Sequence, residues 1–161
     1  MNHNKEYPTS IEEILAQLKE DDLVAALDQK IQQKWARSGD DSLTEAENVF
    51  SCVNGLDIEV YNGGFDQYFY NSAGDFAQDA PAAFRAIGAD LIAGIVSRAC
   101  AVFPDGKPPR NQEQRQQLLL DIGEEGKQLL DVLTDEFYDN QPGQGRILED
   151  YIIEHKIDFQ D

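Results

Sequence analysis

The sequence predicts an all-α protein, a compact single-domain bundle of about seven to nine short helices. Apolar residues recur at helical spacing along most of the chain, and no segment alternates strictly with a period of two. Glycine, proline and asparagine separate the periodic stretches. The chain has 161 residues, of which 41% are hydrophobic, so we expect residues 1–161 to form one globular domain.

The pattern of residues 10–39 predicts two helices. Ser10 can cap the first helix, and Gly39 ends the second. Each helix has one apolar stripe, formed by Ile11, Ile14, Leu15 and Leu18 in the first and by Leu23, Leu27, Ile31 and Trp35 in the second. We expect residues 1–43 to be a helical extension that packs on the rest of the domain.

The next helix begins at a capping box, in which Thr44 and Glu47 satisfy each other's backbone amides. Its apolar seam comprises Val49, Val53, Leu56 and Val60. Pro81 suits the first turn of a later helix, and an apolar helix follows up to Phe103. Beyond the loop at 104–111, helical patterns cover residues 112–122, 124–139 and 145–156.

The stretch EVYNGGFDQYFYNSAGD, residues 59–75, has the residue types of an active-site signature. Catalysis by a nucleophile would need a base and an activated nucleophile, and no histidine lies nearby. A structural role is favoured, because Asn62, Gly63 and Gly64 can end one helix and turn into the next. Phe65, Tyr68 and Phe69 then pack inward, Asp66 and Gln67 could cap or bridge backbone groups, and Asn71 ends the short helix.

An enzyme is the less favoured alternative, and we predict no catalytic, metal or cofactor site. The candidate groups for chemistry are His3, His155, Tyr68, Tyr70, Asp66 and Asp75. Near the end of the last helix, His155 is more typical of a residue that complements the helix dipole. Both cysteines, Cys52 and Cys100, lie in apolar helical stretches and are expected to be buried thiols.

The strongest compositional feature is acidity, with 31 acids against 13 bases and a net charge of −18. Such a chain should avoid nucleic acids and anionic membranes and attract basic partners. No signal peptide is readable, and charges interrupt the most apolar region, residues 82–103. We therefore expect a cytoplasmic protein.

The block NGGFDQYFYNSAGD, with the preceding helix at 44–61 and the segment AIGA at 86–89, resembles a family of small bacterial proteins. The similarity covers about residues 44–155, and it implies an all-α fold. One member of that family is a dimeric DNA mimic, which blocks a helix-turn-helix transcription factor from its operator. The acidity and length of this chain suit that member, but the block itself describes a fold, so mimicry has to be argued from the charges.

The acids are concentrated at the carboxyl end, because residues 121–161 hold twelve acids and three bases. Spread evenly, the net charge would be about fourfold sparser than DNA phosphates, so mimicry requires clustering or two subunits. Charge runs usually form solvated faces, which is the alternative explanation. One cluster comprises Asp121, Glu124, Glu125, Asp131, Asp135, Glu136 and Asp139, and a second comprises Glu12, Glu13, Glu20, Asp21 and Asp22.

Together, the resemblance and the charges predict a homodimeric DNA mimic. It would bind the basic DNA-binding face of a protein partner, a helix-turn-helix transcription factor, and would not bind nucleic acid directly. One alternative is an acidic immunity or antitoxin protein that inhibits a basic nuclease or toxin. Another is an oligomerisation module, for which Trp35, Tyr61 and Tyr151 could form a dimer seam or belong to the core.

Overall fold

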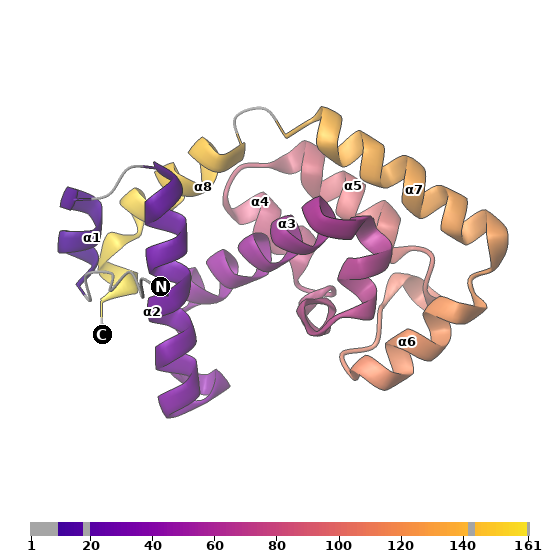
Figure 1. The fold of residues 1–161 in the computed structure, drawn as a ribbon, viewed down its shortest axis with the longest axis horizontal. Helices are drawn as coiled ribbons and strands as arrows, with labels where there is room; N and C mark the ends of the chain where they lie inside the picture. The colour runs from indigo at the N-terminus through magenta and orange to yellow at the C-terminus, as the bar shows by residue number, and fades with distance from the viewer. Residues whose placement is uncertain (1–9, 18–19, 142–143, 161) are drawn as a thin grey trace, which may run out of the picture. The chain divides into compact units, whose positions relative to one another are not determined.

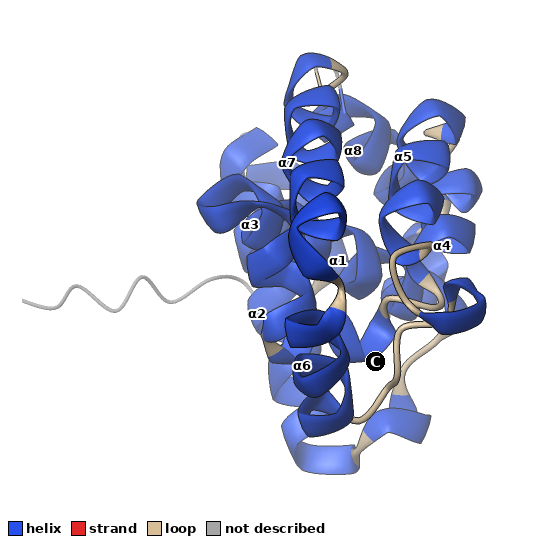
Figure 2. Cartoon of the chain, turned by 90° about the vertical axis from the view of Figure 1, so that its right-hand side faces the viewer, coloured by secondary structure: helices blue, strands red, loops and turns tan. Residues whose placement is uncertain are grey.

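The computed structural model describes residues 10–17, 20–141 and 144–160. In these residues it has eight α-helices, four short 3-10 helices and no strand (Figure 2), which confirms the predicted all-α class. By their contacts, the residues fall into two compact units, one of residues 1–51 with 145–161 and the other of residues 52–144. Each unit is described by itself.

The first unit contains α1 (Ile11–Gln17), α2 (Glu20–Ser38), the first turns of α3 (Glu45–Tyr70) and most of α8 (Gln144–Glu154), shown in Figure 1. The short helix Lys156–Phe159 follows α8, and it contacts α1. The core of this unit includes Phe50 and Phe159, whose rings meet edge to face at 6.3 Å between centroids.

The predicted helix caps are present in the first unit. Ser10 Oγ accepts a hydrogen bond from Glu13 N at 3.2 Å. Thr44 and Glu47 form the capping box, with Glu47 N donating to Thr44 Oγ1 at 3.2 Å and Thr44 N donating to Glu47 Oε2 at 2.9 Å. The buried Glu47 carboxylate also pairs with Lys34 at 2.9 Å.

The apolar stripe of α2 is shorter than expected. Leu23, Leu27 and Ile31 are buried, but Trp35 is 46% exposed. The assignment of Trp35 to the buried stripe was therefore wrong, because four-residue spacing drifts around a helix of 3.6 residues per turn. Gly39 ends this helix with φ +78°, as predicted.

The second unit contains the rest of α3, α4 (Ala80–Ala86), α5 (Asp90–Cys100), α6 (Gln112–Asp121) and α7 (Gly123–Asp139). Helices α4 and α5 form a hairpin, and α5 packs along α7 (Figure 1). Both cysteines are buried free thiols, as predicted, and burial raises each thiol pKa to about 12. Aromatic rings dominate the core of the unit, namely Phe65, Tyr68, Phe69, Phe84, Phe103 and Phe137.

Within the described ranges, no helix combines the length and the apolar character needed to cross a membrane.

Candidate acidic surface at the diglycine corner

The chain turns sharply at Gly63 and Gly64, which lie in the last third of α3. Gly63 has φ −161° and ψ 16°, and Gly64 has φ 78° and ψ −176°, so the helix is broken there, as predicted. The Gly64 backbone lies in a region that essentially only glycine occupies. A Cβ atom at Gly64 would also lie 3.0 Å from Thr134 Oγ1, and one at Gly63 would collide with the Gln67 side chain. We call this break the diglycine corner.

A broken helix leaves backbone groups without their intrahelical partners, and α7 provides replacements. Thr134 Oγ1 accepts a hydrogen bond from Phe65 N at 3.1 Å and donates one to Leu130 O at 2.8 Å. The Tyr138 hydroxyl donates to Val60 O at 2.6 Å. Helix α7 is therefore anchored on both sides of the diglycine corner.

The two arms of the broken helix are joined by amide side chains. Gln67 Nε2 and Asn71 Nδ2 donate to the same oxygen, Glu59 Oε2, at 2.8 and 2.9 Å. Gln67 was expected to cap or bridge backbone groups, and this expectation was wrong, because the Glu59 carboxylate on the other arm is its partner. Hydrogen bonds within the motif thus hold its two arms together.

A buried arginine attaches α6 to the end of the motif. The Arg115 side chain is fully buried and donates to Phe69 O at 2.6 Å, Asn71 O at 2.8 Å and Asp75 Oδ1 at 2.8 Å. Gly74 is required here, because a Cβ atom would lie 2.7 Å from Arg115 Nε. Arg115 could not be singled out from the sequence, because no local pattern distinguishes it from the exposed polar residues of α6.

Helix α7 separates an apolar face from an acidic one. Leu130, Leu133 and Phe137 are buried, whereas Asp131 and Asp135 are exposed one turn apart. Their cost as like-charged neighbours is a few tenths of a kcal/mol per pair. The acidic face therefore does not arise from a requirement for helix stability.

The diglycine corner brings a third carboxylate to this face. Asp66, Asp131 and Asp135 line one hollow of about 260 Å³, together with Gly63, Gly64, Phe65, Thr134 and Tyr138. Burial raises the pKa of Asp66, the neighbouring Asp131 raises it further, and Lys127 lowers it. We call Asp66, Asp131 and Asp135 the corner acids.

The structure assigns different surroundings to the other predicted acids. Glu136 is bound by Arg98 through two hydrogen bonds of 2.6 and 3.2 Å, so part of its charge is neutralised. Glu12 and Glu13 are exposed on α1 in the first unit, and the side chains of Glu20, Asp21 and Asp22 lie outside the described residues. Of the acids in the two predicted clusters, those that are exposed in the second unit are Asp121, Glu124, Glu125, Asp131, Asp135 and Asp139.

Sequence reasoning missed Asp66 as a member of the acidic surface and considered it only as a candidate for chemistry. It stands 65 positions before Asp131, and no spacing rule relates the two. Tyr70 lines a hollow together with Asp66, and the other candidates for chemistry are dispersed. Tyr68 is buried, Asp75 pairs with Arg115 and His155 packs on the Tyr151 ring at 4.2 Å between centroids, while His3 lies outside the described residues.

Tyr61 and Tyr151, two of the aromatics considered for a dimer seam, have opposite environments. Tyr151 is buried in the first unit. Tyr61 is 67% exposed in the second unit and packs edge to face on Tyr138 at 5.5 Å between ring centroids. Tyr151 is therefore a core residue, and Tyr61 packs on the ring whose hydroxyl anchors α7.

The fold and the diglycine corner define a class of protein. It is a small, strongly acidic, all-helical protein in which an acid-rich helix is hydrogen-bonded to a helix that is broken at two glycines. The chain belongs to the DMP19-like protein family, which it matches over residues 41–155, more than half of its length. This match confirms the family resemblance drawn from the sequence. No curated protein and no solved structure matches the chain.

Proposed function

We propose that this protein is a DNA mimic, whose corner acids and neighbouring carboxylates on α7 occupy the basic DNA-binding face of a transcription regulator. Membership in the DMP19-like family supports a DNA-mimic role. The observation that carries the proposal for this chain is the gathering of Asp66, Asp131 and Asp135 around one hollow, in a protein of net charge −18.

The proposed mechanism is competition by occupancy, with no bond made or broken. Lysine and arginine side chains that contact DNA phosphates would pair with carboxylates instead. Phosphate contacts supply much of the affinity of such regulators, so a mimic does not need to reproduce the base edges. The regulator would then be held away from its operator.

A homodimer is part of the proposal, because one chain is short of charge. Two chains carry twice the net charge of −18. That total matches the phosphates along roughly 60 Å of duplex, at about 1.7 Å of helix axis per charge. A dimeric helix-turn-helix regulator reads half-sites about 34 Å apart with two-fold symmetry, so two equivalent acidic surfaces would fit it.

The test is retention of a partner from a bacterial lysate on the immobilised protein, washed at graded salt concentrations. We expect retention of a helix-turn-helix regulator that is lost as salt rises, because the pairing is electrostatic. The double variant Asp131→Lys, Asp135→Lys should lose this partner. The matched control is Asp150→Lys, Glu154→Lys, which reverses two exposed acids at the same spacing on α8 and should keep it.

The proposal would be contradicted if the Asp131→Lys, Asp135→Lys variant retained the regulator as well as the wild type does. It would also be contradicted if salt did not change the retention. Retention of a nuclease or toxin in place of a regulator would favour the immunity or antitoxin function instead. The substituted residues of both variants are exposed, so we expect both variants to fold. An unchanged helical circular-dichroism spectrum is the check.

A further inference from the structure

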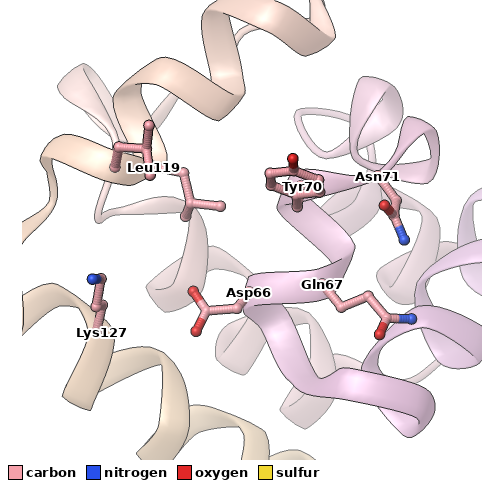
Figure 3. Close-up of a pocket in the computed structure, with 7 residues that line it drawn as sticks. Asp66, Gln67, Tyr70, Asn71, Leu119 and Lys127 are labelled. Carbon is pink, nitrogen blue, oxygen red and sulfur yellow. The ribbon is translucent and has the colours of Figure 1, made fainter.

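A second hollow, larger than the one between the corner acids, opens on the other side of Asp66. It has a volume of about 570 Å³ and is lined from α3 by Asp66 and Tyr70, from the end of α6 by Leu119 and Leu120, and from α7 by Lys127. Figure 3 shows Asp66 and Lys127 on facing walls, with the amides of Gln67 and Asn71 pointing away from Leu119 and Lys127. We call this hollow the corner pocket.

The walls of the corner pocket are held in place by hydrogen bonds. Gln112 Nε2 and Gln116 Nε2, both on α6, donate to Tyr70 O at 3.0 and 2.7 Å. Arg115 fastens the same helix to Phe69 O. The backbone segments that carry the apolar wall and Tyr70 are therefore held together before any ligand arrives, which lowers the entropic cost of binding.

The apolar part of the pocket is unusually exposed. Leu120 is 69% exposed and Tyr70 is 54% exposed. Apolar side chains that gather in a hollow rimmed by charges are typical of interaction sites. The apolar wall indicates a ligand with a hydrocarbon portion.

The charged part of the pocket indicates a cation. The Asp66 carboxylate has no hydrogen bond and no ion pair in the part of the chain that the structure describes, and it stands next to the like-charged Asp131. A cation at Asp66 would relieve that repulsion. Lys127 occupies the facing wall, so the favourable position for a cation is on the Asp66 and Tyr70 side.

We infer that the corner pocket receives an arginine side chain of the DNA-binding partner, with its guanidinium between the Asp66 carboxylate and the Tyr70 ring and its methylene groups on Leu120. A planar guanidinium pairs with a carboxylate and stacks on an aromatic face, which a lysine ammonium does less well. The methylene stem of the same side chain covers apolar surface. The inference rests on the proposed function and adds to it a specific anchor.

The anchor makes a prediction that a purely electrostatic surface does not make. Tyr70→Ala and Leu120→Ala leave every charge in place, so mimicry by charge alone predicts no loss of affinity. An anchor in a pocket loses much of its binding energy when the pocket wall is removed. Leu91→Ala on α5 is the matched control, because Leu91 is 64% exposed and lies in the same unit as Leu120.

The probes are an octa-arginine and an octa-lysine peptide, which carry equal charge, and the measurement is isothermal titration calorimetry with the full chain. We expect Tyr70→Ala and Leu120→Ala to weaken binding of octa-arginine by about fivefold or more and to change binding of octa-lysine by less than about twofold. Leu91→Ala should bind both peptides as the wild type does.

Unchanged binding of octa-arginine by Tyr70→Ala and Leu120→Ala would overturn the inference while leaving the proposed function standing, since that function is tested by reversal of Asp131 and Asp135. If these variants do not fold, methyl NMR on the wild type provides the answer. Octa-arginine should shift the Leu119 and Leu120 methyl signals more than octa-lysine does, and equal or absent shifts would refute the anchor.

Discussion

The hydroxyl of Thr134 accepts a hydrogen bond from the backbone amide of Phe65 at 3.1 Å, and this contact joins the acid-rich helix α7 to the broken helix α3. The amide would otherwise be without a partner, because the break at Gly63 and Gly64 removes its place in the helical ladder. The motif at residues 59–75, which has the residue types of an active site, thus has a structural role. It determines where Asp131 and Asp135 lie relative to Asp66.

Replacing Thr134 by valine should destabilise the fold by about 1–3 kcal/mol, because the Phe65 amide loses its acceptor while the shape of the side chain is preserved. Urea denaturation measures the change in the free energy of unfolding. Thr134→Ser, which keeps the hydroxyl, is the control and should lose less. A Thr134→Val variant as stable as Thr134→Ser would show that the hydrogen bond does not hold the corner.

Replacing Gly64 by alanine should destabilise the protein by about 1–3 kcal/mol, because its backbone conformation is costly for any residue with a Cβ atom. Gly94→Ala is the opposite control, since Gly94 lies inside α5 and a Cβ atom there meets nothing within 4 Å. Gly94→Ala should stabilise the protein by about 0.5–1 kcal/mol, the difference in helix propensity. Thermal unfolding of the two variants should therefore shift in opposite directions, and a shift in the same direction would contradict the account of the corner.

Replacing Arg115 by methionine should cost about 1–3 kcal/mol, since the carbonyls of Phe69 and Asn71 and the Asp75 carboxylate would lose their common donor. The pocket formed by α6 and the end of α3 should open as well. Hydrogen exchange of the α6 amides reports this opening. Exchange in Arg115→Met as slow as in the wild type would mean that the buried arginine is not what attaches α6.

We expect the stability of the protein to depend on pH through the carboxyl group of Asp57. Burial raises its pKa from 3.8 to about 7. Between about pH 4 and pH 7 the folded protein then holds a proton that the unfolded chain has released, so the contribution of this group to stability falls as pH rises. Asp57→Asn cannot ionise, and it should be more stable than the wild type at about pH 8 but not at about pH 4. An equal difference in melting temperature at the two pH values would show that Asp57 is not titrating as predicted.

Local features of the fold could be predicted from the sequence because they depend on residues close in the chain. The caps at Ser10 and at Thr44 with Glu47 involve positions three apart, and the turn at Gly64 depends on the conformational freedom of glycine itself. The acids of α7 could be assigned to one helix by their spacing for the same reason.

The candidate site could be predicted only in part, because its defining contacts join distant segments. Asp66 meets Asp131 only after α3 has turned back on itself, and the neutralisation of Glu136 depends on Arg98, 38 positions earlier. Helical periodicity shows which side of a helix is polar, but it does not show what another helix brings to that side. The same limit explains Arg115, because its partners within the motif lie at least 40 positions away in the sequence.

The most direct test of the central claim is displacement of a regulator from DNA. The regulator retained in the lysate experiment is bound to a fluorescent duplex, and the protein is added at constant ionic strength while anisotropy is recorded. The account predicts that the wild type and the Asp150→Lys, Glu154→Lys control release the duplex, whereas Asp131→Lys, Asp135→Lys leaves it bound. A regulator that binds the protein and the duplex at the same time, with no fall in anisotropy, would contradict the claim that the corner acids take the place of DNA phosphates.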